Sequence, residues 1–256
     1  MAGAISHTVP RSEAQSAAVR ALQAERLFYV IAGIVMLVAT LIGFRFFLLH
    51  GQGIGGGPIT QQIVPLVVIH GLAMFSWIIL FLVQSLLILY RNPRLHMSLG
   101  VGGAVLAGIM VPLGSVAATL SVHNNPDTYK YLGGPKFFLA TMLGEMLSFG
   151  FFVAIAVFYR RRPEIHRPMM LLATLMIISG SLGRCPYIEN SIRPPLYVLG
   201  SALVLGAIFV VLHWGMTRKL SRWFAYGYAA MVIACVAFVV VGNSAWWQQM
   251  VSAIVP

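Results

Sequence analysis

Hydrophobic residues along the chain gather in seven long runs separated by short polar breaks, at about 27–49, 62–90, 97–121, 136–159, 168–184, 195–215 and 224–245. Each run is close to the roughly 20 residues that a helix needs to cross a hydrocarbon layer of about 30 Å. The runs are continuous, whereas membrane-spanning strands alternate apolar and polar residues. Helices also satisfy their own backbone hydrogen bonds in lipid. The pattern therefore predicts an all-α integral membrane bundle of seven helices.

Composition agrees with a lipid environment. Of the 256 residues, 59% are hydrophobic and only 9% are charged, whereas a soluble domain carries about 25% charged residues. The mean hydropathy is +0.86. A chain of this kind cannot cover itself with a polar surface, so the lipid bilayer is its expected partner.

The net charge of +11 would indicate a nucleic-acid partner in a soluble protein, but the positions of the basic residues exclude that interpretation. Twelve of the 17 Lys and Arg residues precede the first run or follow the second, fourth and sixth runs. All of these positions lie on one side of a seven-pass bundle. The positive-inside rule then places the N-terminus in the cytoplasm and the C-terminus outside. We expect the bacterial inner membrane as the location.

The first 26 residues are polar and mixed in charge. They lack the short apolar core and the small-residue cleavage site of a secretory signal. We therefore predict two parts: a cytoplasmic tail over 1–26, partly helical from Ala17, and a transmembrane domain over 27–256.

One short phrase occurs twice between hydrophobic runs. "YRNPRLH" covers 90–96, and "YRRRPEIH" covers 159–166. Both read as cytoplasmic turns, in which arginines fix the side of the membrane and proline breaks the helix. The chain thus contains two parallel helical hairpins, made by spans two and three and by spans four and five, related by an axis along the membrane normal. A turn explains every residue of the phrase except the histidine.

Two ionisable residues lie well inside the predicted spans: His70 in the second and Glu145 in the fourth. Insertion of such a group costs about 2.5–3.5 kcal/mol. Each lies roughly 12–13 Å from the outer end of its helix at a rise of 1.5 Å per residue. The matching depth predicts a contact that forms a metal site or a proton relay. The alternative is an interhelical hydrogen bond that only fixes packing.

Other polar residues lie in the same outer half of the spans. A divalent metal bound by His70 and Glu145 needs a third ligand, which either His50 or His123 could supply from an outer loop. Arg184 ends the fifth span. It either extends to the outer interface or binds an anionic group such as a propionate or a phosphate.

Three further histidines, His96, His166 and His213, lie at the cytoplasmic ends of the spans. His96 and His166 occupy equivalent places in the two hairpins. Solvated histidines are one interpretation of all three, because an imidazole at a boundary is easily exposed. Histidines on facing helices are also the ligands of a b-type haem or a divalent metal. No compact motif such as HExxH or CxxCH decides between these cofactors.

The segments "HGLAMFSWIILFLVQSLLI", "RNPRLHMSLG" and "LGEMLSFGFFVAIAVFYRRRPEIHRPMMLLATLMIISGSLGR" together resemble a family of uncharacterised bacterial multi-pass inner-membrane proteins. The resemblance covers about 70–184. Glu145 stands where the family usually has Asp, and Pro168 is a second departure. A looser resemblance links the chain to four-helix cytochromes of the b561 type, although a single intramembrane histidine argues against a two-haem version. The family pattern marks these positions: His70, Trp77, Gln84, His96, Glu145, His166 and Arg184.

Four hypotheses for function follow. The favoured one is a redox protein that holds haem or a metal between spans two to five and exchanges electrons with quinone. The second is a proton-coupled carrier or sensor of a small molecule that uses Glu145 and His70, for which a homodimer is expected. The third is an intramembrane enzyme that acts on lipid through a metal-bound water. The fourth is an accessory or assembly subunit of a larger membrane complex, in which polar groups only join helices.

Overall fold

The computed structural model describes residues 11–53, 61–185 and 194–255 of the chain. Its regular elements are helices, and in this part of the chain seven of them are long and apolar enough to cross a membrane. The prediction of an all-α seven-helix bundle is thereby confirmed. The seven are α1 (Arg11–Gly43), α3 (Val64–Leu89), α4 (Pro93–Asn124), α5 (Pro135–Phe158), α6 (Pro163–Leu182), α8 (Pro194–Thr217) and α9 (Arg222–Asn243).

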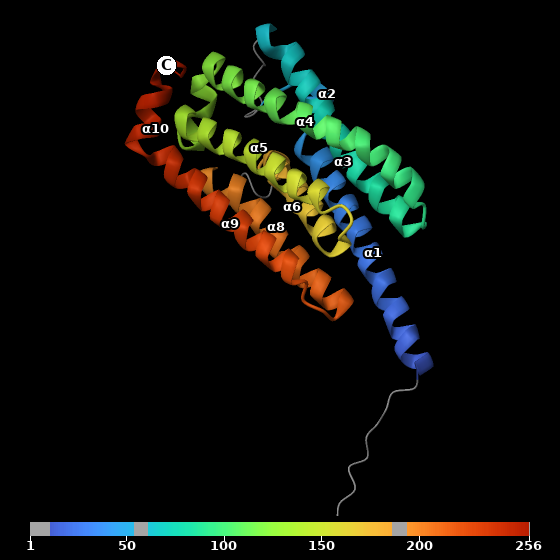
Figure 1. The fold of residues 1–256 in the computed structure, drawn as a ribbon. Coiled ribbons are helices and arrows are strands. Elements are labelled where there is room, and N and C mark those ends of the chain that lie inside the picture. The colour runs from blue at the N-terminus through green and yellow to red at the C-terminus, as the bar shows by residue number, and fades with distance from the viewer. Residues whose placement is uncertain (1–10, 54–60, 186–193, 256) are drawn as a thin grey trace, which may run out of the picture.

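The two ends of the bundle differ in the segments that connect the long helices (Figure 1). One carries the turns α3–α4, α5–α6 and α8–α9 and the start of α1; we call it the basic end, because most of the arginines lie there. The other, which we call the far end, carries short elements. They are α2 (Arg45–His50), η2 (Gln61–Ile63), η3 (Pro126–Leu132), α10 (Ala245–Met250) and η4 (Val251–Ala253).

Proline and capping side chains set where the long helices begin. Pro93, Pro135 and Pro163 stand in the first positions of α4, α5 and α6, where the missing N–H would have no partner in any case. Asn92 caps α4 by accepting a hydrogen bond from the backbone N–H of Leu95. The polar breaks in the sequence thus mark real helix starts.

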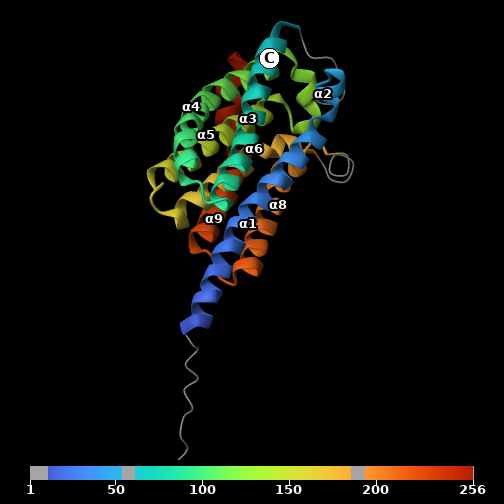
Figure 2. The same cartoon turned by 90° about the vertical axis from the view of Figure 1, so that its right-hand side faces the viewer.

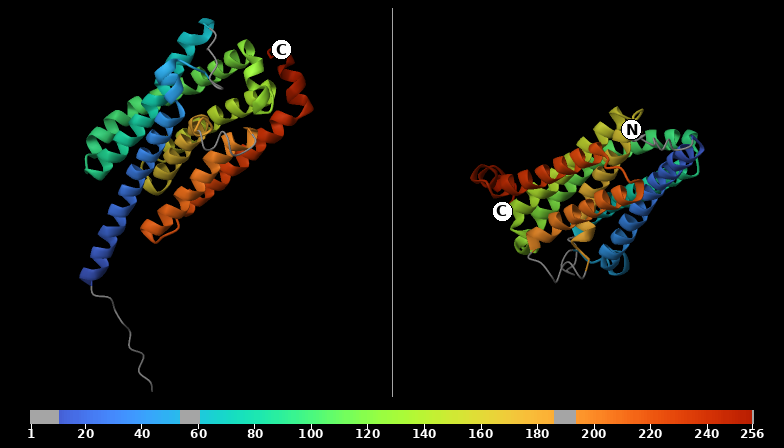
Figure 3. Two further views of the ribbon diagram at one scale, coloured as in Figure 1. Left: turned by 180° about the vertical axis from the view of Figure 1, so that it is seen from behind. Right: turned by 90° about the horizontal axis from the view of Figure 1, so that it is seen from below.

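Helix α6 lies at the centre of the bundle. It packs against α1, α5, α8 and α9, and 72% of its most apolar window is buried, the highest share of any span. The remaining contacts run α1–α3, α3–α4, α4–α5, α5–α9, α9–α8 and α8–α1, so these helices surround α6. Figures 2 and 3 show this arrangement from the side, from behind and from below, with α1 extending past its neighbours at its N-terminal end.

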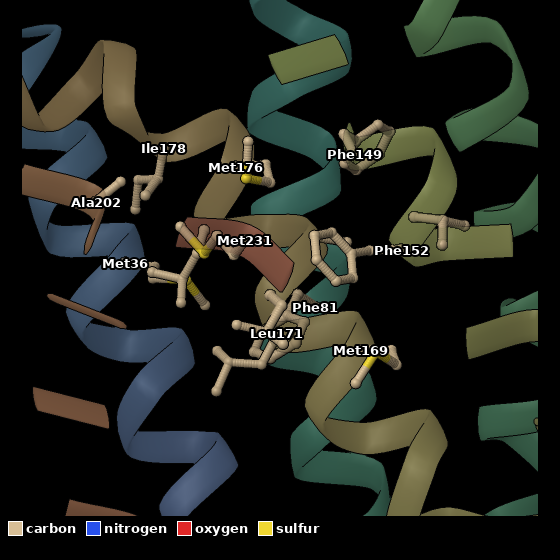
Figure 4. Close-up of a cluster of buried hydrophobic side chains, with 14 of the residues drawn as sticks. Met36, Phe81, Phe149, Phe152, Met169, Leu171, Met176, Ile178, Ala202 and Met231 are labelled. Atoms are coloured by element: carbon tan, nitrogen blue, oxygen red, sulfur yellow. The ribbon is translucent and has the colours of Figure 1, made fainter. Parts of the chain in front are cut away.

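The core combines aliphatic, methionine and aromatic side chains. Met36 of α1, Met176 of α6 and Met231 of α9 meet near the centre, beside Phe149 and Phe152 of α5 (Figure 4). All five are buried. Between helices in a membrane such contacts act through close packing rather than through release from water.

The outer surface is apolar as well. Along α4, exposed valines and isoleucines lie at helical spacing, with Val101 at 69% and Val105 at 60% relative exposure. Ile233 of α9 is 69% exposed. An apolar surface on a helical bundle is what contact with lipid tails requires, and it agrees with the predicted bilayer environment.

The first helix differs from its predicted limits. The hydrophobic run suggested a span of about 27–49, but α1 begins at Arg11 and ends at Gly43. Part of the predicted tail is therefore helical. At Gly43 a β-carbon would overlap the backbone of Ser181 in α6, and Phe44 leaves the helical conformation before α2 begins. The chain turns where the two backbones come closest.

Candidate functional site

The two repeated phrases fold into matching turns at the basic end. Tyr90 ends α3 and Tyr159 ends α5. Proline then opens the next helix in each case, and a histidine follows three residues later, in the first helical turn. These are His96 in α4 and His166 in α6. The sequence repeat is therefore also a repeat of local structure.

The turns bring the two histidines together. Their ring centroids lie 6.2 Å apart with an interplanar angle of 89°. Both residues are half-buried. The two imidazoles come from helices that are not consecutive in the chain, so their approach depends on the whole arrangement of α3 to α6.

The ring of His166 is fixed by a backbone hydrogen bond. Its Nδ1 lies 2.8 Å from the carbonyl oxygen of Ala156 in the last turns of α5. A carbonyl oxygen only accepts, so Nδ1 carries the proton and donates. In a neutral ring the Nε2 lone pair is then available. Metal-binding histidines in proteins are oriented in this way.

His96 is held differently. Gln84 of α3 donates from Nε2 to the backbone carbonyl oxygen of His96 at 3.1 Å. The Nδ1 atom of His96 is buried and has no hydrogen-bond partner among the described residues. A buried polar atom without a partner is uncommon in a folded protein and indicates a functional group or a missing ligand.

An ion pair lies next to this pair of histidines. Arg167 of α6 contacts Glu25 of α1 at 3.1 Å, and both side chains are 24% exposed. The pair joins the N-terminal half of α1 to the start of the helix that carries His166. No pattern in the sequence predicts this ion pair, because the two residues are far apart along the chain and neither stands in a motif.

Glu145 has a partner other than the predicted one. It is 3% exposed in α5, and the hydroxyl of Ser179 in α6 donates to its Oε1 at 2.6 Å. His70 of α3 lies instead beside Gly114 and Met146, with its Nδ1 buried and without a partner. Within the described part of the chain no hydrogen bond or ion pair joins Glu145 to His70.

The predicted third ligand is placed elsewhere. His123 Nδ1 donates to the carbonyl oxygen of Ile254 at 2.6 Å, which ties the end of α4 to the C-terminal segment. Across the described ranges, no three or more His, Cys, Asp or Glu side chains form a group that could hold a metal. The structure therefore does not assemble His70, Glu145 and His123 into one metal site.

Arg184 lies at the far end in a local set of contacts. Its guanidinium donates to the carbonyl oxygen of Gly180 and lies 4.7 Å from the ring centre of Phe44. Arg45 donates to the backbone carbonyl of Arg184 at 3.3 Å. Partial burial raises the pKa of the adjacent Cys185 thiol, an effect that the charge of Arg45 opposes. Burial likewise raises the pKa of Tyr129 in η3.

His213 differs from the solvated histidine that its position suggested. It is only 5% exposed, and its ring meets those of Phe28 and Phe224 edge to face, with centroids 5.0 and 5.7 Å away. Phe28 of α1 and Phe224 of α9 cover the ring, so helix packing buries a histidine that the sequence places at the end of a span.

The comparisons with known proteins add no relative: no protein-family model, curated protein or solved structure matches the chain. The resemblance of its motifs to an uncharacterised membrane family stays a prediction. The candidate site is therefore defined by geometry, and the strongest geometry is the approach of His96 and His166.

Proposed function

We propose that this protein is an integral membrane haem or metal protein with a redox role, and that His96 and His166 hold the cofactor. The observation that carries the proposal is the 6.2 Å separation of the two ring centroids. Two imidazoles at this separation could each direct a ring nitrogen toward one metal between them, because a metal–nitrogen bond is about 2 Å long.

A b-type haem fits the number of ligands best. The described residues supply two histidines here and no third His, Cys, Asp or Glu to complete a group. A four-coordinate divalent metal would need further ligands from outside the protein. A haem would need fewer ligands from the chain, and His96 and His166 would supply them. When bound, such a group supplies one-electron chemistry, and a membrane quinone would be a suitable electron partner.

The two histidines have separate parts in this proposal. The bond to Ala156 fixes the ring of His166 and leaves Nε2 as the ligating atom. The unpartnered Nδ1 of His96 offers a second nitrogen. Gln84 fixes the backbone at His96 and so would act as a positioning residue.

The test is an absorption spectrum with metal analysis of protein purified from cells. We expect a Soret band, or a bound transition metal, in the wild-type protein. His96→Ala and His166→Ala should each lose most of it, because one of the two imidazoles that would hold the cofactor is gone. His123→Ala is the matched control: it removes a histidine at the far end and should keep the cofactor. Colourless, metal-free wild-type protein would overturn the proposal, as would equal loss in all three variants.

A second candidate function is a proton-linked carrier or sensor centred on Glu145. The observation that favours it is the burial of this acid against Ser179, between the central helix and α5. Infrared difference spectra recorded against pH would test it, with Glu145→Gln to identify the carboxyl band. A band that titrates reversibly supports proton exchange with solvent. A band that never changes between mild acid and mild alkali would leave Glu145 with a packing role only.

A further inference from the structure

A groove of about 400 Å³ lies at the basic end, between the N-terminal half of α1 and the end of α3. These two helices pack side by side along the bundle (Figure 2). The side chains that matter for its chemistry are Arg20, Gln23, Arg26 and Leu27 of α1, and Leu89 and Arg91 at the end of α3.

The groove is strongly basic. Three arginines line it, and among the described residues no Asp or Glu does. The ion pairs among the described residues are Lys130–Asp127 and Arg167–Glu25. Glu25, although next to Arg26 in the sequence, is thus engaged with α6. Three like charges around one hollow repel each other unless an anion lies between them.

Arg26 supplies a specific donor. Its Nε–H is buried and has no acceptor within the described part of the chain. A buried donor left unsatisfied is costly, and an oxyanion in the groove would satisfy it once the side chain turns toward the groove. Guanidinium groups bind phosphate oxygens through paired N–H bonds, which makes arginine the preferred residue for this contact.

The position of the groove indicates where the anion comes from. The apolar span of α1 begins at Val19, and that of α3 ends at Leu89. The groove therefore lies at the boundary of the hydrocarbon region, where lipid phosphates are found. Leu27 and Leu89 add apolar surface beside the arginines. Basic pockets between membrane helices bind lipid headgroups in this manner.

We propose that this groove binds the phosphate of an anionic phospholipid from the leaflet at the basic end. The lipid would join α1 to the α3–α4 turn, through Arg20 and Arg26 on one side and Arg91 on the other. The site is independent of the histidine pair.

Native mass spectrometry of the full chain, released from nanodiscs of phosphatidylglycerol and phosphatidylcholine, tests this. The wild type should retain phosphatidylglycerol in preference to phosphatidylcholine. Arg26→Gln with Arg91→Gln should reduce the retained phosphatidylglycerol about tenfold. Arg160→Gln with Arg161→Gln is the matched control: it removes the same charge from exposed positions of the α5–α6 turn and should retain the lipid.

Further measurements distinguish specific lipid binding from binding of free phosphate and from general charge attraction. Arg91→Lys keeps the charge but loses the paired N–H donors of the guanidinium group. This variant should therefore bind the lipid more weakly than the wild type, with unchanged helical content by circular dichroism. Added inorganic phosphate should not displace the lipid; if it does, and if phosphate alone binds to the same arginines, the lipid assignment is overturned. Equal loss of lipid in both double variants would show general charge attraction and would also overturn the proposal.

Discussion

His96 and His166, although equivalent in the repeat, differ in how their ring nitrogens are satisfied. His166 donates to a backbone carbonyl, whereas His96 keeps a buried nitrogen without a partner. A hydrogen bond contributes roughly 1 kcal/mol to stability, and an unsatisfied buried group costs about 1–3 kcal/mol. His166 therefore stabilises the fold through this hydrogen bond, whereas His96 does not.

This difference predicts opposite effects on stability. In protein without cofactor, His166→Ala should lower the free energy of unfolding by about 1 kcal/mol, and His96→Leu should leave it unchanged or raise it by a similar amount. Thermal unfolding in one detergent, followed by circular dichroism, measures both. A clear destabilisation by His96→Leu would contradict this prediction, because it would mean that the ring of His96 makes a contact that stabilises the fold.

A second residue-scale prediction concerns Cys185, whose thiol is partly buried and donates to the carbonyl oxygen of Ser181 at 3.6 Å. Because burial raises its pKa, less thiolate is present at neutral pH than in an exposed cysteine. Alkylation by a maleimide should be slow near neutral pH and should accelerate as pH rises beyond the range of an ordinary thiol. Cys185→Ser, which leaves only the buried Cys235, is the control and should remain unlabelled. Fast labelling below pH 7 would contradict the prediction.

Part of the candidate site could be predicted from the sequence. The repeated phrase placed His96 and His166 at equivalent positions, and equal spacing from proline put both in the first turn of a helix. The partner of Glu145 could not be predicted, because depth along a helix fixes a level in the membrane but not a direction around the axis. Glu145 turns toward α6 and meets Ser179, while His70 turns toward α4.

At the scale of helices, close backbone contact decides the geometry more than hydrophobicity does. The approach of α1 to α6 at Gly43 leaves no room for a side chain. Hydrophobic runs show which segments cross the membrane, but they do not show where two helices touch. For this reason the sequence predicted seven spans correctly and still placed the end of the first one several residues too late.

The contact predicts that Gly43→Ala destabilises the bundle by roughly 1–3 kcal/mol, because the new methyl group meets backbone that cannot rotate away. Gly102→Ala is the matched control: a β-carbon at this exposed position of α4 meets nothing within 4 Å. It should be neutral, or stabilising by up to about 1 kcal/mol through helix propensity. Comparable melting temperatures for the two variants would rule out a tight α1–α6 contact.

At the scale of the whole molecule, the arginines gathered at one end predict the orientation in the membrane. Arg161 in the α5–α6 turn and Asp127 in η3 are both exposed, at opposite ends of the bundle. In a background without Cys185 and Cys235, Asp127→Cys should react with a membrane-impermeant maleimide in intact spheroplasts. Arg161→Cys should react only after lysis. The reverse pattern would place the N-terminus outside.

We propose that two hairpins, made by one repeated phrase, bring His96 and His166 to a single cofactor. The most direct test is the amount of haem or transition metal bound per chain, measured on wild-type protein purified from cells and on the variant with both histidines replaced by alanine. We expect about one bound group per chain in the wild type and only traces in the variant. Equal traces in both proteins would contradict it and would leave the histidine pair as a packing contact in an accessory membrane subunit.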